Sequence, residues 1–397
     1  MAEVHQARED ALTETVIATQ VLDEVHVRIG QYFQRREMRE RARRYLSGLL
    51  SHVARKNSWQ LAEALGERGP QGVQRLFTDA GWDADAVRDA LRRYVVEQLG
   101  DATSGVLVVD ETGFLKKGPK SAGVARQYSG TAGRRENQQI GVFLLYASEH
   151  GAAFVDRALY LPEAWAADAA RRAEAHIPPE VAFATKGDLA RGMLAGAFAS
   201  GVPARWVVGD TVYGSDELRG WLEGQDRPYV LAVPSTHAVW SRGRPRTVAE
   251  LAAALPTRAW ARLSAGQGSQ GPRLYDWAWV RLPYADVAPG RAQWLLVRRS
   301  LPDIQQPDTP AELKYYRAYG PEETALTELV RVAGRRWTIE EAFEQAKGEV
   351  GLDEYEVRRY DAWARHITLA LLAHAALEVT RAHLTQAAQT AALKGEV

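Results

Sequence analysis

Two short apolar runs, each leading into an aspartate, constrain the fold of this chain more than any other feature. Residues 106–109 come directly before Asp110, and residues 206–209 come directly before Asp210. An uninterrupted apolar run of this length is typical of a strand that is covered on both faces, as in a sheet flanked by helices. The two runs therefore predict an α/β core with a carboxylate at the end of each of two strands.

The elements expected around these runs follow the order strand, hairpin, helix, strand, helix, strand. This is the order of ribonuclease H-like folds, so the expected fold class is α/β, with a ribonuclease H-like mixed sheet. The strands are predicted at 106–109, 140–146, 153–160, 206–209 and 229–233, and the helices at 189–200 and 215–223.

Helical patterns flank this core on both sides. Helical periodicity covers 14–99, where Asn57 and Asp83 are predicted helix caps, and it returns at 327–350 and 363–384. Alternating runs between 234 and 325 predict β-strands. The expected organisation is a helical DNA-binding domain at 1–100, the first part of a catalytic core at 101–233, a β-rich insertion subdomain at 234–325, and the completion of the core with C-terminal helices at 326–397.

Two of these regions have an alternative interpretation. Short successive helices before residue 100 fit a DNA reader of the helix-turn-helix type, and they fit equally well a bundle that only packs against the core. The arginines between 35 and 44 suit contact with a DNA backbone, although interleaved glutamates also suit a solvated helix. In the insertion, a tryptophan is expected in the core, with stacking on an unpaired base as the alternative.

Composition excludes several classes of protein. The 397 residues include no cysteine, so disulfides and thiolate metal sites are impossible and any metal must be bound by oxygen or imidazole. No stretch approaches the roughly 18–20 apolar residues that span a bilayer, and the N-terminus lacks a signal pattern, so we expect a cytoplasmic protein. The 50 basic residues equal the 50 acidic ones, so any DNA binding depends on local patches.

A basic segment at 112–140 follows the first aspartate directly. Basic side chains interleaved with aromatic ones are typical of a surface that binds nucleic acid, while a solvated loop is the alternative. The residues predicted to contact DNA in this segment are Lys116, Lys117, Arg126, Arg134 and Arg135.

A third string, R-R-W-T-I-E-E-A-F-E-Q-A-K, places a carboxylate between basic residues on a predicted helix. Arg336, Glu340 and Lys347 are spaced by four and seven residues, so their side chains lie on one helix face. Taken alone, Glu340 fits a surface ladder of charges better than it fits a site. With the two aspartates it completes a set of three carboxylates, which are the hard ligands that Mg²⁺ prefers. This layout indicates a divalent-metal site for phosphodiester chemistry.

The carboxylates beside these three are expected to lie outside the site. Glu111 follows Asp110 on a strand, where alternation sends successive side chains to opposite faces. Glu341 points roughly 100° around the helix from Glu340.

At these residues the chain resembles the DDE transposases of bacterial insertion sequences. Members of that group carry a Tyr-Arg-Glu-Lys signature, which Arg336, Glu340 and Lys347 match in spacing, together with the string R-W-x-I-E-E. The strings D-E-T-G-F-L-K-K-G, R-Q-Y-S-G-T-A-G and G-D-T-V-Y-G resemble the DDE superfamily endonuclease subset of the group. The tyrosine of the signature falls on Ala333, so its role must be absent or supplied by another residue.

The resemblance, which covers 46–379, implies a cut-and-paste transposase that cleaves DNA at the element ends and transfers the strand to a target. It implies that Asp110, Asp210 and Glu340 hold two Mg²⁺ ions, which Mn²⁺ can replace, and that Arg336 and Lys347 contact phosphates. The implied partners are double-stranded DNA, as transposon ends and as target, and a second copy in a homodimer on DNA. The alternative is a catalytically silent, transposase-derived DNA-binding or regulatory protein.

Other catalytic classes fit less well. The histidines lack a close metal-binding spacing, and His366 and His374 suit packing within a helix. Nucleotide-binding glycine strings are absent from the sequence. A glycosidase would use paired carboxylates, but it would leave the basic residues beside them without a role.

Overall fold

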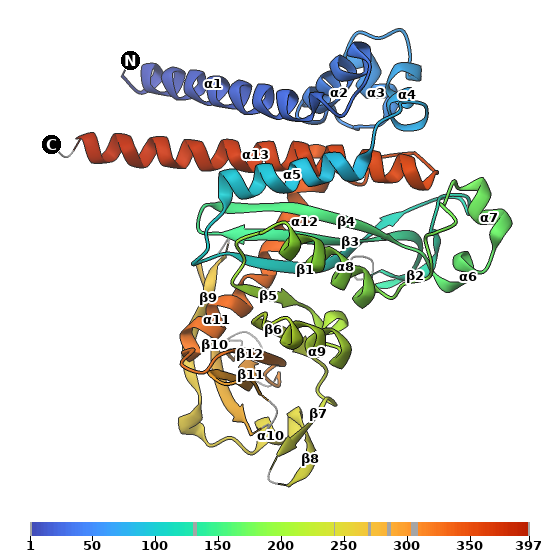
Figure 1. The fold of residues 1–397 in the computed structure, drawn as a ribbon. Helices are drawn as coiled ribbons and strands as arrows, with labels where there is room; N and C mark the ends of the chain where they lie inside the picture. Colours follow the sequence, from blue (N-terminus) through green and yellow to red (C-terminus); the bar gives the residue numbers. More distant parts are fainter. Residues whose placement is uncertain are drawn as a thin grey trace.

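The computed structural model describes residues 2–129, 133–241, 243–268, 271–283, 287–302 and 309–395, and it has the expected mixed α/β fold (Figure 1). Its strands are β1 (Val106–Leu115), β2 (Ala125–Ser129), β3 (Arg134–Ser148), β4 (Gly151–Tyr160), β5 (Trp206–Gly209), β6 (Tyr229–Val233), β7 (Ala238–Ser241), β8 (Arg244–Thr247), β9 (Ala261–Gly268), β10 (Gly271–Leu282), β11 (Arg291–Arg299) and β12 (Leu313–Pro321). In these ranges, ten strands form one sheet with the order β2-β3-β1-β5-β6-β12-β11-β10-β9, and β4 pairs with β3.

The centre of the sheet is parallel and brings the two aspartates together. β1 pairs with β5 in parallel, and the last paired residues are Val109 and Gly209. Asp110 and Asp210 therefore follow neighbouring positions on adjacent strands. Asp210 lies at a strand end, as predicted, but Asp110 does not, because β1 continues to Leu115 by antiparallel pairing with β3.

The strands from the 234–325 region continue this sheet. β12 pairs with β6 in antiparallel fashion, and β11, β10 and β9 follow outward. Trp277 and Trp294 are buried in the core, as expected for tryptophans at alternating positions, and the Trp279 ring stacks on that of Trp294 at 5.8 Å between centroids. Trp240 differs, since it is 54% exposed on the separate β7–β8 hairpin. The region is rich in strands, as expected, but most of them belong to the sheet of the core.

Helices cover both faces of the sheet. They are α1 (Ala2–Gly30), α2 (Arg36–Leu49), α3 (Ser58–Ala64), α4 (Gln71–Thr78), α5 (Ala84–Leu99), α6 (Glu163–Ala166), α7 (Ala169–Glu174), α8 (Lys186–Ala199), α9 (Asp216–Gly224), α10 (Val248–Ala253), α11 (Leu326–Gly334), α12 (Arg336–Val350) and α13 (Tyr360–Gly395), with 3₁₀ turns at Thr211–Tyr213 and Thr257–Ala259. Of the helices in the described ranges, none combines the length and the apolar character that crossing a bilayer requires.

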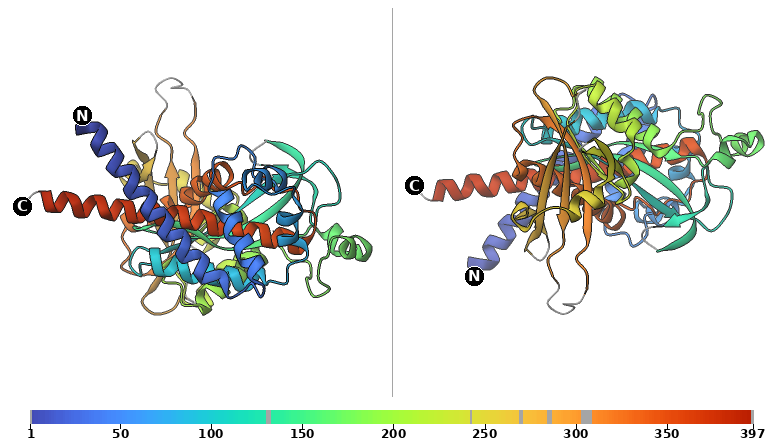
Figure 2. Two further views of the ribbon diagram at one scale, coloured as in Figure 1. Left: turned by 90° about the horizontal axis from the view of Figure 1, so that it is seen from above. Right: turned by 90° about the horizontal axis from the view of Figure 1, so that it is seen from below.

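The N-terminal helices pack on the long helix α13 and on the sheet. Asn57 and Asp83 cap α3 and α5 as predicted, because their side chains accept hydrogen bonds from backbone N–H groups of the first turn. α1, α2, α4 and α5 lie along α13, and the projecting ends of α1 and α13 extend from the same side of the molecule (Figures 1 and 2). This shared core supports the interpretation of a packed bundle, and DNA contact by its outer surface stays a prediction.

The helix expected at 327–350 is divided into α11 and α12. Gly334 ends α11 against β9, so closely that a Cβ atom there would lie 1.8 Å from the carbonyl oxygen of Ala265. The chain then restarts with Arg336 as the first residue of α12, which ends at Gly351 in a left-handed conformation (φ 62°). Periodicity alone did not predict this break, which lies beside the contact between Gly334 and β9.

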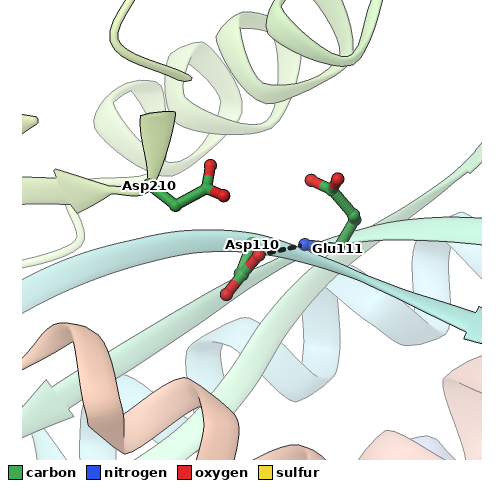
Figure 3. Close-up of side chains that lie close together, drawn as sticks. All are labelled: Asp110, Glu111 and Asp210. Carbon is green, nitrogen blue, oxygen red and sulfur yellow. Dashed lines mark hydrogen bonds between the residues drawn. The ribbon is translucent and has the colours of Figure 1, made fainter. Parts of the chain in front are cut away.

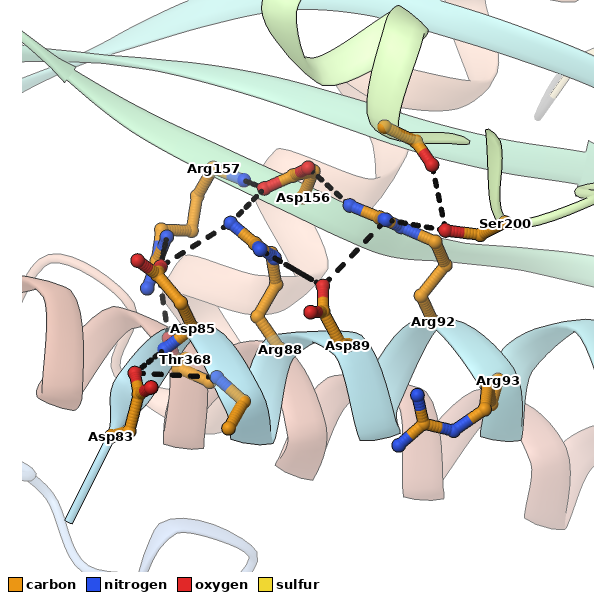
Figure 4. A network of polar contacts seen from close by, with 12 residues as sticks. Asp83, Asp85, Arg88, Asp89, Arg92, Arg93, Asp156, Arg157, Ser200 and Thr368 are labelled. Carbon is orange, nitrogen blue, oxygen red and sulfur yellow. Dashed lines mark hydrogen bonds and ion pairs between the residues drawn. The ribbon is translucent and has the colours of Figure 1, made fainter. Parts of the chain in front are cut away.

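A buried ionic network attaches α5 to the sheet (Figure 4). Asp156 on β4 is 3% exposed, and it forms ion pairs with Arg92 and, at 3.3 Å, with Arg88. On the neighbouring residue of β4, Arg157 contacts Asp85 at 2.8 Å. Each buried charge in the network thus has a partner of opposite sign.

We predict that Asp156→Ala lowers the free energy of unfolding by about 3–5 kcal/mol, because the buried Arg92 loses its nearest carboxylate and keeps only Asp89, at 3.6 Å, as an ion-pair partner. Denaturant unfolding followed by circular dichroism measures the change. Glu174→Ala is the control, since it breaks an exposed ion pair with Lys120 and is expected to cost less than about 1 kcal/mol. Equal effects of the two substitutions would contradict the structural role of the network.

Candidate active site

A cleft of about 740 Å³ opens above the point where β1 and β5 part. Carboxylates reach it from three elements: Asp110 and Glu111 from β1, Asp210 from the end of β5, and Glu340 from α12. Arg336 lines the same cleft one helical turn before Glu340. The structure therefore brings together four of the residues that the sequence singled out, Asp110, Asp210, Arg336 and Glu340, and adds Glu111.

Three of the carboxylates form a tight group. One oxygen each from Asp110, Glu111 and Asp210 lies within 4.8 Å of the other two (Figure 3). The expectation that Glu111 lies outside the site is therefore wrong. Figure 3 shows that alternation along β1 does separate Glu111 from Asp110, but it directs Glu111 to the side on which Asp210 lies. The neighbouring strand thus supplies the carboxylate that Glu111 joins.

The group is electrostatically strained. Burial raises the pKa of Asp110 to about 8, and the charges of Asp210 and Glu111 add to the shift. Burial, and then Glu111, also raises the pKa of Asp210. Backbone hydrogen bonds offset part of this cost. Asp110 accepts a hydrogen bond from the N–H group of Glu111 at 2.8 Å, and Asp210 accepts a hydrogen bond from that of Val212 at 2.9 Å. Converging oxygen ligands with excess negative charge suit a hard divalent cation.

Arg336 stands between the aspartates and Glu340. Its Nη1 atom lies 3.5 Å from Asp110 Oδ2, and its Nη2 atom donates to Glu340 Oε1 at 2.5 Å. The Glu340 side chain is 49% exposed and is held by this ion pair at the edge of the cleft. Glu340 thus faces Asp110 across the guanidinium of Arg336.

The other basic residues of the predicted site differ in their surroundings. Lys347 donates to Thr112 Oγ1 at 2.8 Å and so lies against β1. Lys116 lies over the ring of Tyr355, 3.4 Å from its centroid, and burial lowers its pKa to about 8. The other four, Lys117, Arg126, Arg134 and Arg135, are exposed.

The basic segment reaches the rim of the cleft through β2. Gln127 and Tyr128 of this strand line the cleft, and Arg126 precedes them. Residues 130–132 of the string R-Q-Y-S-G-T-A-G lie outside the described residues. The exposed cations are thus placed to meet a ligand that extends beyond the cleft.

Sequence reasoning missed two residues that contact the carboxylate group. Lys186, the first residue of α8, donates to Glu111 Oε1 at 2.6 Å, and the Tyr213 hydroxyl donates to Glu111 Oε2 at 2.5 Å. Tyr213 lies in the string G-D-T-V-Y-G, which also contains Asp210, so the sequence did indicate that it lies near the site. Lys186 is 75 residues from Glu111 and sits in no motif that we singled out, so only the fold reveals it.

Ala333, at the position of the missing signature tyrosine, is part of the hydrophobic core. Ala333 is 1% exposed on α11, and it is not one of the residues that line the cleft. Tyr128 and Tyr160 line the cleft from β2 and β4 instead. Hydroxyl groups are therefore available at the cleft from other elements.

Comparison with known proteins places these residues in a family. The sequence matches the model of the DDE superfamily endonucleases over residues 28–271 and that of the transposase DDE domain over residues 185–376. A similar curated protein is the "Probable transposase for insertion sequence element IS701" of Microchaete diplosiphon, with 34% identity over 95 residues. That match spans 24% of this chain and 25% of the relative's length.

The raised pKa of Asp110 predicts a pH-dependent cost to stability. Between about pH 4 and pH 8 the folded chain holds a proton that the unfolded chain has lost, so stability falls as the pH rises through this window. Without metal, Asp110→Asn is expected to raise stability by at least about 1 kcal/mol at pH 8 and by much less at pH 4. Thermal melting in a chelator at several pH values measures the difference.

Asp226→Asn is the control of opposite sign. Arg291 binds this carboxylate and lowers its pKa, so the substitution is expected to reduce the melting temperature at neutral pH. A melting temperature of Asp110→Asn that stays at or below the wild-type value at pH 8 would show that the carboxylate group is not strained.

Proposed function

The chain belongs to the family of DDE superfamily endonucleases, and we propose that it is the DNA transposase of an insertion sequence. The observation that carries the proposal is the cleft that Asp110 of β1, Asp210 at the end of the adjacent strand β5, and Glu340 of α12 all line. The carboxylates suit divalent ions, and exposed cations nearby suit a polyanion. The matched segment of the transposase from Microchaete diplosiphon supports the same conclusion.

Asp110, Asp210 and Glu340 would hold two Mg²⁺ ions, or Mn²⁺ in their place. When bound, such ions lower the pKa of the attacking water or hydroxyl and neutralise charge on the phosphate. The oxygen-only donor set fits these ions, and the excess negative charge of the group needs a cation. Arg336 offsets part of that charge, and beside bound ions its guanidinium would be placed to contact a phosphate oxygen.

The proposed reaction has two steps. In the first, water attacks the phosphorus at the element end, the P–O3′ bond breaks, and a 3′-hydroxyl and a 5′-phosphate are left. In the second, that 3′-hydroxyl attacks a phosphodiester of the target and displaces its 3′-oxygen. The second step exchanges one phosphodiester bond for another, so it requires no external energy source.

The proposed partners follow from this reaction. Double-stranded DNA serves as element end and as target, and Lys117, Arg126, Arg134, Arg135 and Lys347 would contact its phosphates, with Lys116 more enclosed. Since transposition joins two ends, we infer a homodimer on DNA. The proposed location is the cytoplasm, where a bacterial chromosome lies.

The alternative is a silent descendant that binds DNA without cutting it. Arg336 forms an ion pair with Glu340. If metal ions failed to displace the guanidinium from this carboxylate, the site would lack a ligand and the silent alternative would be favoured. The presence of all three carboxylates in one cleft favours activity. Cleavage assays decide between the two.

We predict metal-dependent nicking of a labelled duplex that carries the element's own ends, with Mg²⁺ or Mn²⁺ and not with a chelator. Glu340→Gln and Asp210→Asn are expected to reduce the rate by about 100-fold or more, because loss of a metal ligand removes several kcal/mol of transition-state stabilisation. Glu341→Gln, on the next residue of α12, is the matched control and should keep its activity. Binding of the ends by wild type without cleavage in either metal would support the silent alternative.

We further predict that the exposed cations contribute to DNA affinity through phosphate contacts. Lys117→Ala and Arg126→Ala should each reduce the slope of log affinity against log salt by about 0.9. Lys314→Ala is the control, since Lys314 lies on β12, several strands away from β1 and β2, and is expected to leave the slope unchanged. Fluorescence anisotropy over a salt series tests this, and slopes equal to that of wild type would place the DNA elsewhere.

A further inference from the structure

Lys186 is a cation of the cleft to which the proposed reaction assigns no role. Lys186 reaches the carboxylate group from the first turn of α8, and its side chain is 23% exposed. Its ammonium donates to Glu111 Oε1 at 2.6 Å, and the Glu111 side chain is 19% exposed. Lys186 therefore lines the same cleft as Asp110 and Asp210 and carries a positive charge there.

The partners of Glu111 suit support of this lysine better than metal binding. Lys186 engages one of its oxygens, and the hydroxyl of the fully buried Tyr213 engages the other. Tyr213 belongs to the turn that follows β5, so the hydrogen bond ties Glu111 to the same element that carries Asp210. Both oxygens of Glu111 thus accept a hydrogen bond from a side chain.

Lys186 also marks the way out of the cleft. A second hollow adjoins the first, and the two share Tyr160, Lys186 and Val212 in their walls. This second hollow continues along α8 as far as Arg191. A polymer whose reacting phosphate lies at Asp110 and Asp210 and whose chain continues into the second hollow passes the ammonium of Lys186.

We propose that Lys186 binds a backbone phosphate of the DNA strand beside the reacting one, and that Glu111 and Tyr213 position its ammonium for this contact. The inference rests on the proposed transposase function. A compact ammonium suits a single phosphate oxygen, and its three donors allow it to keep the hydrogen bond to Glu111 while it contacts DNA. Glu111 is then a positioning residue, and its negative charge beside the two aspartates is balanced by Lys186.

The test begins with DNA binding in a chelator, where no cleavage occurs. Lys186→Met is expected to reduce the slope of log affinity against log salt by about 0.9, and Lys186→Arg to preserve it. Lys314→Met is the matched control, because Lys314 also faces a glutamate, Glu312, at 3.5 Å but lies on β12 away from the cleft residues. Circular dichroism confirms that each variant is folded.

Cleavage then separates positioning from metal binding. Lys186→Met is expected to lower kcat/KM by about tenfold to a hundredfold, as for the loss of a charge-assisted hydrogen bond. Glu111→Gln and Tyr213→Phe should lower it less, add little to Lys186→Met in double variants, and leave the half-saturating Mg²⁺ concentration unchanged.

Two outcomes would overturn the inference while the proposed function stands. In the first, wild type cleaves and Lys186→Met matches it in both salt slope and kcat/KM. In the second, Glu111→Gln raises the half-saturating Mg²⁺ concentration by tenfold or more, which makes Glu111 a metal ligand. Wild type that neither binds nor cleaves the element ends would overturn the proposed function, and the inference with it.

Discussion

Repulsion among the carboxylates at the parting of β1 and β5 is the constraint on which the rest of this structure depends. Asp110, Glu111 and Asp210 each place one oxygen within 4.8 Å of the other two in a partly buried position. Each charge there raises the free energy of the others, so the group persists only because the surrounding fold over-determines it. The parallel pairing of β1 with β5 holds the group together, since it fixes Asp110 and Asp210 on adjacent strands.

Cations from separate elements balance this group. Arg336 comes from α12 and Lys186 from α8, and each forms an ion pair with a different carboxylate of β1. The position of Arg336 depends in turn on the break at Gly334, where α11 meets β9 and the chain begins a new helix. The edge strands of the sheet thus bear on the site, although they lie several strands away from the aspartates.

The sequence predicted those parts of the fold that local patterns determine. The predicted bounds of β5 and β6 are confirmed, as are the caps Asn57 and Asp83, because a buried strand and a helix start each have a short-range pattern. The division of the 327–350 helix and the extension of β1 past Asp110 were not predicted. Both depend on a partner far away in the chain, β9 in one case and β3 in the other.

For the site, the sequence by itself determined the types and spacings of Asp110, Asp210, Arg336 and Glu340, and hence the family and the kind of chemistry to expect. The tertiary structure alone decided that Glu111 joins the carboxylates, that Lys186 and Tyr213 hold it, and that Arg336 separates Asp110 from Glu340. The physical reason is that sequence patterns and electrostatic interactions depend on different kinds of distance. Motifs and periodicity describe neighbours along the chain, whereas charges act on whatever the sheet brings within a few ångströms, however many residues lie between.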